Sequence, residues 1–482
     1  MSYKSSRKEE ADFMSPTKRF ILIWVSVLLF NLTATAISHA DVTITYINLG
    51  AGGTALLRVP SPPGGGPRDH IGIFVMHPSS SFINSPICTE LANRGYRTLC
   101  ADNPFSFNAN GYKGYEDHSA IIARGINCLK GQNPPGQTSS PCSSITGITR
   151  IIIIGHSMAG PMMSFYQNIA ENGAAACKKP QRLIPCEDTN LSNLPTADGV
   201  VLLDSHLGDA VATMTYTDPA VIREQQPDLR DSRVDMFDPA NGYNLTTNSA
   251  TYSDNFRKVF LAGQSRRHNK LIDDALEQLS DITNDRRNVY PDDMPFVVPG
   301  SNGARLWQPD TRLLKCTQAT YLLLTNANPT GEGPKQICSV RLPSGNQGAL
   351  TFDSVTSASV RIWLGAHSVR TTKDYNQTPD DITGIVYESS NTSTPTNIEG
   401  ITKPLLIVVM GAHYFMRPDE IILTHATRTN DKEMVAVEGA VHGFTPCTAC
   451  AVAQGLPANA YGDTVKRLFD HVDSWLSKPG RF

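Results

Sequence analysis

Ser157 lies in a segment whose residue types can make a serine hydroxyl reactive. Four consecutive isoleucines, Ile151 to Ile154, run directly into Gly155-His156-Ser157-Met158-Ala159-Gly160. A strand buried on both faces of a parallel sheet is apolar throughout, as this run is. The small residues around Ser157 allow the strand and the following segment, 161–167, to approach each other closely. The pattern predicts a buried strand, a sharp turn with Ser157 at its tip, and a helix. The alternative is a buried strand followed by a chance serine.

This strand–turn–helix pattern is that of a nucleophile elbow, whose usual motif is G-x-S-x-G. The last glycine of the motif is replaced by Ala159, and Gly160 follows it. Because the turn needs small side chains rather than glycine as such, we interpret alanine as a tolerated departure.

His442 is the candidate base for Ser157. It follows the apolar strand predicted at 434–437, within Glu438-Gly439-Ala440-Val441-His442-Gly443-Phe444. A serine hydroxyl is a poor nucleophile at neutral pH, whereas a histidine with an ordinary pKa of about 6.5 can take its proton and later return it. His156, inside the elbow, and His77, at the end of another strand, are weaker rivals. The alternative for His442 is a loop histidine bonded to the backbone.

The order of strand, nucleophile, acid and final-strand histidine resembles the α/β-hydrolase superfamily of serine esterases and lipases. The resemblance covers 41–204 and 401–482, and its specific parts are the segments around Ser157 and His442. It implies an α/β fold with a mostly parallel central sheet flanked by helices, and a triad of serine, histidine and acid.

The acid is the member of the triad whose assignment the sequence leaves undecided. The superfamily usually places it just beyond a glycine after the seventh strand, but Gly411-Ala412-His413-Tyr414 contains no carboxylate. The other known placement is the end of the sixth strand, where Asp204 ends the apolar run 199–203. We therefore expect Asp204 to be the acid, with Glu420 or Asp419 as alternatives. A residue that merely caps the loop is the remaining interpretation of Asp204.

The oxyanion hole is expected to combine two backbone N–H groups. In this fold one comes from the residue after the nucleophile, here Met158, and the other from the loop after the third strand. That loop begins His77-Pro78-Ser79 after the strand predicted at 71–76. Because Pro78 has no N–H, Ser79 is the candidate donor. The alternative is an ordinary strand-to-loop transition.

Composition indicates an ordinary globular protein. The chain has 482 residues, of which 40% are hydrophobic and 18% charged, with a net charge of −3. Nothing in this balance favours a nucleic-acid partner or a membrane surface. The triad chemistry requires no metal or organic cofactor, so the expected partner is a small-molecule or polymeric ester substrate.

Residues 1–40 are typical of a secretory signal. Lys18 and Arg19 precede the apolar run 20–30, and Ser38-His39-Ala40 offers a cleavage site. The run is about half of the roughly 20 residues that a bilayer span needs, so no stable span is expected after signal removal. A retained anchor is the alternative, and Met14 is an alternative start. The expected location is secreted or periplasmic.

The ten cysteines support export, since their even number suits an oxidising compartment. They fall into near-neighbour pairs, which predicts five disulfides. For the last pair, a redox motif or half of a zinc site is the alternative. The expected pairs are 88–100, 128–142, 177–186, 316–338 and 447–450.

The domain organisation predicted from the strand rhythm is a split core. Residues 41–204 form its first part, 205–400 an inserted cap, and 401–482 its last part. The expected function is that of a secreted serine hydrolase cleaving a carboxylic ester through an acyl-serine intermediate. The same triad could instead act on an amide, a lactone or a carbon–carbon bond, and a catalytically silent binding protein is a further alternative.

Overall fold

The computed structural model of the chain describes residues 41–61, 66–102, 104, 114–284, 294–301, 303–344 and 356–482. The expected signal sequence, 1–40, lies outside these residues. Ala40–Phe482 form one compact unit. Within the described ranges, no helix combines the length and the apolar character that crossing a membrane requires.

A ten-stranded, mostly parallel sheet runs through the centre of this unit, in the order β1-β2-β4-β3-β5-β6-β15-β16-β10-β11. The pairs from β4 to β10 in this order are parallel, while β1–β2, β2–β4 and β10–β11 are antiparallel. The expected α/β fold class is therefore confirmed, and the sheet begins with an antiparallel hairpin of β1 and β2. The strands are β1 Val42–Gly50, β2 Gly53–Pro60, β3 Ile71–Met76, β4 Arg97–Asp102, β5 Arg150–His156, β6 Gly199–Leu203, β10 Cys316–Leu324, β11 Glu332–Cys338, β15 Leu405–Met410 and β16 Lys432–Val437.

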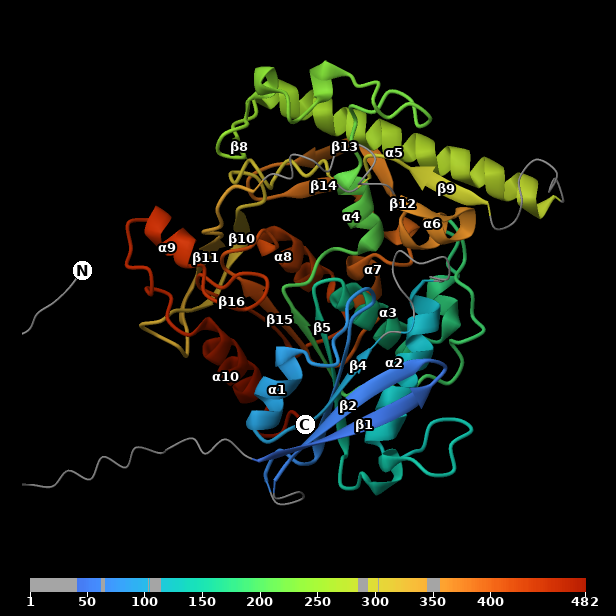
Figure 1. Cartoon of the computed structure of the whole chain (residues 1–482), viewed down its shortest axis with the longest axis vertical. Coiled ribbons are helices and arrows are strands. Elements are labelled where there is room, and N and C mark those ends of the chain that lie inside the picture. The colour runs from blue at the N-terminus through green and yellow to red at the C-terminus, as the bar shows by residue number, and fades with distance from the viewer. Residues whose placement is uncertain are drawn as a thin grey trace, which may run out of the picture. The chain divides into compact units, whose positions relative to one another are not determined.

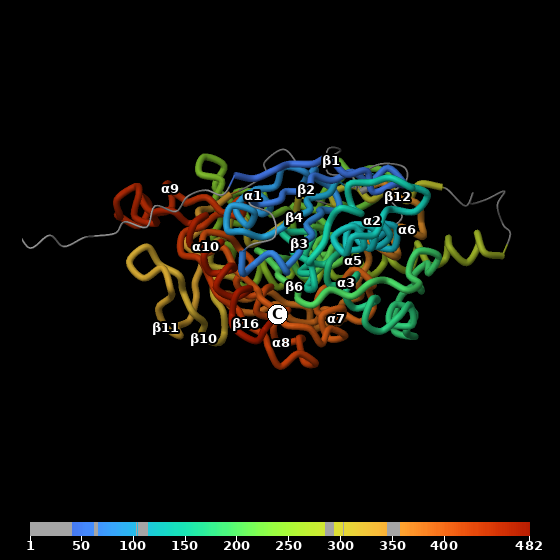
Figure 2. Tube along the Cα trace, turned by 90° about the horizontal axis from the view of Figure 1, so that it is seen from below, coloured from blue at the N-terminus to red at the C-terminus, as the bar shows by residue number. Residues whose placement is uncertain are grey.

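Helices cover both faces of the sheet, which explains the continuous apolar runs. In β5, Ile151 and Ile153 pack in one core cluster, while Ile152 and Ile154 pack in another on the opposite face. Full burial of each such side chain contributes about 1.5–3 kcal/mol. Figures 1 and 2 show α1 and α10 on one side of the sheet and α2 and α3 on the other. Their bounds are α1 Pro86–Asn93, α10 Thr464–Leu476, α2 Tyr115–Leu129 and α3 Ala159–Asn172.

Much of the segment between β6 and β15 forms additional structure beyond the sheet, including the long helix α5 at the top of Figure 1. Its helices are α4 Asp209–Tyr216, α5 Asp254–Thr283, α6 Val360–Ala366 and α7 Thr394–Ile398. Its small sheets pair β7 Tyr243–Asn244 with β8 Ser249–Ala250, β9 Pro295–Val298 with β12 Thr356–Ser359, and β13 Arg370–Gln377 with β14 Ile382–Val386.

The expected cap boundaries of 205–400 need one correction. Strands β10 and β11 lie inside that range but extend the central sheet. Leu322, Leu323 and Leu324 of β10 pair in parallel with the end of β16, so their apolar side chains continue the core. The segment from Cys316 to Cys338 therefore belongs to the core and not to a cap.

All five expected disulfides are present: 88–100, 128–142, 177–186, 316–338 and 447–450. Each joins cysteines that are near neighbours in sequence, and one of them, 316–338, ties β10 to β11. Disulfides on this scale are consistent with an oxidising, extracytoplasmic compartment.

Candidate active site

Ser157 occupies the sharp turn between β5 and α3. Its φ of 57° lies in the left-handed region, which a non-glycine residue seldom adopts. A Cβ atom at Gly155 would lie 2.5 Å from the carbonyl oxygen of Ala159, and one at Gly160 would clash with Ser205 Oγ. The closest approach thus falls at Gly160 rather than at Ala159, which explains why alanine is tolerated at the last motif position.

Asp204 and His442 meet at the carboxyl end of the sheet. Asp204 follows β6 directly, has a φ of 46° and is 0% exposed. The N–H of Met410 donates to its Oδ1 over 3.2 Å, and His442 Nδ1 lies 2.5 Å from its Oδ2. The N–H of Ser157 donates to the carbonyl of Leu203 over 3.1 Å, which ties the elbow to the residue before Asp204. The geometry therefore brings the expected acid and base together beside the elbow.

The electrostatics of Asp204 favour its charged form. Burial alone would raise the pKa of its carboxyl group, but the contacts with His413 and His442 outweigh burial and hold the pKa well below its ordinary value. Asp204 is therefore a carboxylate at neutral pH.

The rival histidines hold backbone in place. His156 Nε2 donates to the carbonyl oxygen of His442 over 2.9 Å, and the two rings lie 4.5 Å apart. Burial lowers the pKa of His156 to about 3.

Among the described contacts there is no hydrogen bond between the Ser157 hydroxyl and His442, a bond that often tightens only when substrate is bound.

The alternative acids are engaged elsewhere. Glu420, in α8 (Met416–His425), accepts N–H groups of Gln318 and Ala319 and pairs with Arg417 at 2.7 Å. Asp419 is 0% exposed, and burial raises the pKa of its carboxyl group well above the ordinary value. In the described part of the chain, neither carboxyl group contacts His442.

Comparisons with known proteins add little at the level of sequence, because no family model and no curated protein matches the chain. Brefeldin A esterase, described as a bacterial homologue of human hormone-sensitive lipase, is a similar structure at 11% identity, covering 95% of this chain and 80% of that chain with a TM-score of 0.37. Est1E from Butyrivibrio proteoclasticus is 10% identical, covering 90% and 97%, with a TM-score of 0.32. Proline iminopeptidase from Mycobacterium smegmatis is 10% identical, covering 90% and 97%, with a TM-score of 0.34.

TM-scores this low establish nothing by themselves. The parallel sheet flanked by helices and the strained elbow after β5 decide the fold. The chain has the α/β-hydrolase fold.

The two residues expected to supply the oxyanion donors, Ser79 and Met158, are in side-chain contact. The hydroxyl of Ser79 donates to Met158 Sδ over 3.8 Å. Met158 directly precedes α3, where the first N–H groups of a helix have no acceptor within the helix. The N–H of Ser79, however, donates to His77 Nδ1 over 3.2 Å, as does the N–H of Ser80 over 3.0 Å. In this structure the Ser79 N–H is therefore engaged by His77.

His77 itself acts as an acceptor in that loop. Burial lowers the pKa of His77 to about 4, which keeps it neutral. Because its Nδ1 accepts two N–H groups, its proton lies on Nε2. Its ring also stacks on Phe82 at 4.7 Å. The sequence predicted His77 at the border of the oxyanion loop, but no residue pattern indicated that its ring accepts N–H groups of that loop.

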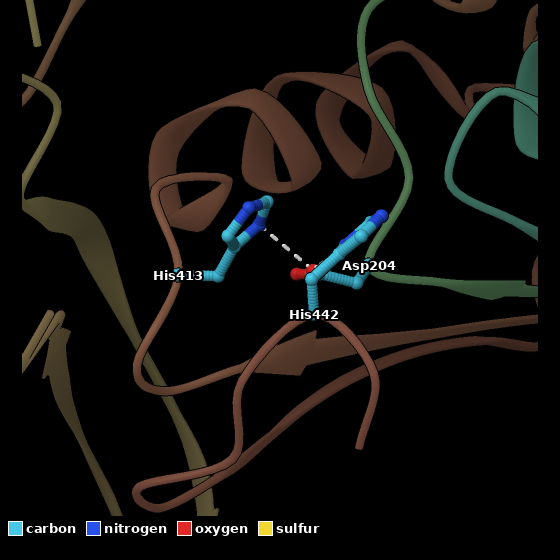
Figure 3. Close-up of side chains that lie close together, drawn as sticks. All are labelled: Asp204, His413 and His442. Atoms are coloured by element: carbon cyan, nitrogen blue, oxygen red, sulfur yellow. Dashed lines mark hydrogen bonds and ion pairs between the residues drawn. The ribbon is translucent and has the colours of Figure 1, made fainter. Parts of the chain in front are cut away.

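His413 is the residue that sequence reasoning missed. It follows β15, in the position where the superfamily usually carries its acid, and its Nδ1 lies 2.8 Å from Asp204 Oδ2 (Figure 3). Asp204, His413 and His442 offer three ligand atoms within 4.8 Å of one another, as a metal site would. Yet both imidazole nitrogens lie within hydrogen-bonding distance of the same oxygen, which leaves no room for an ion between them.

A small apolar pocket lies close to the base without being lined by it. Its volume is about 30 Å³. One of its walls is Phe415, whose ring lies 6.0 Å from that of His442. Aromatic and aliphatic side chains from α4, from the segment before β10 and from the loop after β15 complete it, among them Val211, Tyr216, Trp307, Leu314 and Tyr414.

Proposed function

We propose that this protein is a serine hydrolase that cleaves carboxylic esters through an acyl-serine intermediate. The observation that carries the proposal is the contact between Asp204 Oδ2 and His442 Nδ1, beside a strained elbow that bears Ser157. A buried carboxylate in contact with a half-buried imidazole is the arrangement that a general base needs.

In the proposed reaction, Ser157 Oγ attacks the ester carbonyl carbon and His442 Nε2 takes its proton. The same proton goes to the departing alcohol, and water then repeats the sequence on the acyl-serine. Asp204 holds His442 with its proton on Nδ1 and stabilises the imidazolium as it forms. These steps use no metal or organic cofactor.

The oxyanion that forms on the substrate would be bound by the Met158 N–H at the start of α3. The Ser79 N–H is the proposed second donor, and it would have to leave His77 Nδ1 to serve. Substrate binding would therefore include a small movement of the loop after β3.

The apolar pocket next to Phe415, at about 30 Å³, is too small to hold a substrate group, so the choice of bond rests on the chemistry of the leaving group. Amides, lactones and carbon–carbon bonds would use the same three residues, and the ester is preferred because its alcohol leaves most easily. The signal-like segment 1–40 and the five disulfides support export of the protein.

A fluorophosphonate probe tests the proposal, since it forms a covalent bond with an activated serine. We expect stoichiometric labelling of the folded protein, complete loss in Ser157→Ala, and full labelling in Ser144→Ala, a control at an exposed serine. A folded protein that resists the probe would instead be a silent binding protein. A panel of matched esters and amides then identifies the bond, with faster turnover expected for the esters.

A further inference from the structure

One oxygen of Asp204 is approached by two imidazoles. His442 Nδ1 lies 2.5 Å and His413 Nδ1 2.8 Å from the same Oδ2, while Oδ1 accepts the Met410 N–H. Figure 3 shows the two rings reaching the carboxylate from the loops after β15 and β16. A single hydrogen bond to the base would be enough for a triad, so the second imidazole requires an explanation.

His413 is held there by contacts that do not involve His442. Its N–H donates to the carbonyl of Met410 over 3.0 Å, and its own carbonyl accepts the Ser339 hydroxyl over 2.5 Å. Its ring packs on Tyr414 at 4.0 Å and meets the ring of Phe415 edge-on at 4.7 Å. The position of the imidazole is thus fixed by its own loop and by the end of β11.

The contact determines the protonation of His413. A nitrogen lone pair 2.8 Å from a carboxylate oxygen would be repelled, so Nδ1 carries the proton. The N–H bond does not point straight at Oδ2, which makes the contact electrostatic rather than a well-formed hydrogen bond. Burial lowers the pKa of His413, so the ring is neutral when His442 acts as a base.

The order in which the rings stack indicates which of the two histidines lies next to the elbow. His442 lies between His156 of β5 and His413, with ring centres 4.5 Å apart on each side. His442 is therefore the imidazole next to the elbow, and His413 is on the far side of it. His413 therefore influences the reaction through Asp204 Oδ2 and through its ring contact with His442, and the variants described below separate these two effects.

We propose that His413 is a positioning residue that shares the carboxylate of Asp204 with His442 and weakens the hold of that carboxylate on the His442 proton. This inference rests on the proposed function. The carboxylate stabilises the His442 imidazolium, and an N–H dipole on the same oxygen withdraws part of that stabilisation. Removing the His413 N–H should therefore strengthen the hold of Asp204 on the His442 proton.

Other ionisable groups near His413 and His442 are the same in wild type and in the variants, so they do not affect the comparison between them. Around His413 these are Arg341 and Tyr414; around His442 they are His77, His156 and His206; and beside Asp204 lies Asp419, whose pKa burial raises.

Two variants of His413 test the proposal. His413→Phe keeps a ring against His442 but has no N–H for Asp204, whereas His413→Asn places an uncharged amide donor where Nδ1 was. The pH midpoint of the His442 ring is followed by NMR, and the acid limb of fluorophosphonate labelling at Ser157 is followed in parallel. We expect His413→Phe to move both upward by about 0.5 to 1 unit, because Asp204 loses the N–H dipole of His413, and His413→Asn to leave both near wild type.

An unchanged or lowered midpoint in His413→Phe would overturn the proposal, and so would equal shifts in the two variants. If circular dichroism shows that His413→Phe does not fold, His413→Leu takes its place. Loss of labelling in His413→Phe but not in His442→Phe would make His413 the base and would also overturn it. Because the NMR midpoint needs no activity, a wild-type protein that resists the probe refutes the proposed function separately.

Discussion

Replacing Asp204 by asparagine tests the proposed triad most directly. The substitution preserves shape and burial but removes the charge. The Met410 N–H keeps the amide oxygen at the place of Oδ1, so the new NH₂ group faces both His442 and His413. Two donors cannot share one hydrogen bond, and His442 must turn its Nδ1 into an acceptor. Its proton then lies on Nε2, where the base should accept one.

The expected magnitude follows from this change of tautomer. Such an exchange in a serine triad costs about 10⁴-fold in kcat, which is equivalent to about 5 kcal/mol of lost transition-state stabilisation. KM should stay within a few-fold, because Asp204 is 0% exposed and does not touch substrate. The assay is ester hydrolysis across pH, together with the rate of fluorophosphonate labelling.

Asp419→Asn is the matched control. Asp419 is equally buried but does not contact His442, so an amide there should leave kcat within about 3-fold of wild type. Glu420→Gln weakens the pair with Arg417 and should lower stability rather than kcat. A 10⁴-fold loss in either control, with Asp204→Asn near wild type, would refute the assignment of the acid.

Three further predictions concern the elbow, a buried acid and the pocket. Gly160→Ala should lower the melting temperature because its Cβ clashes with Ser205 Oγ, and adding Ser205→Gly should recover most of the loss. Burial raises the pKa of Asp209 to about 7, so the native state binds more protons than the unfolded state between about pH 4 and 7. The free energy of unfolding therefore falls as pH rises through this range. Asp209→Asn should flatten this decline, measured by urea unfolding at each pH. Val211→Trp adds far more volume than the apolar pocket of about 30 Å³ can accept and should lower the melting temperature, whereas Val211→Ile should fit and leave it near wild type.

Each of these has an outcome that would contradict it. A fully stable Gly160→Ala would mean that the turn can relax away from Ser205. An unchanged pH slope in Asp209→Asn would assign the decline to other groups, such as Glu116, whose pKa burial raises to about 7. Equal melting temperatures of Val211→Trp and Val211→Ile would show that the pocket can expand to accept the larger ring.

Local patterns in the sequence predicted much of the fold. The isoleucine run of β5 indicates a strand covered on both faces, and Ile151 to Ile154 are indeed split between two core clusters. The disulfides were predictable because each joins near neighbours, so that turn geometry alone brings the thiols together. The same locality explains the elbow, since Gly155 and Gly160 serve contacts within a few residues of Ser157 or at the adjacent strand end.

Features that depend on non-local pairing were not predictable. β10 joins the sheet through only three residue pairs with β16, from a segment more than a hundred residues away in sequence. The engagement of the Ser79 N–H by His77 depends on the fold of the loop after β3, and no residue pattern announces it. His413 carries no charge and follows a strand, so by sequence it resembles any loop histidine.

The usual position of the acid, after β15, and Asp204, after β6, are far apart in sequence but close in space. β6 and β15 are parallel neighbours, and Leu203 pairs with Val408. A side chain leaving the end of either strand can therefore reach the same point beside His442. Moving the carboxylate from one strand to the next preserves the contact with the base and leaves a vacant position after β15. His413 occupies that position and reaches the same oxygen. Asp204 therefore supplies the carboxylate from the end of β6, and His413 fills the position after β15 that the acid usually holds. We expect a substitution of His413 to change the protonation of His442 only while Asp204 retains its charge.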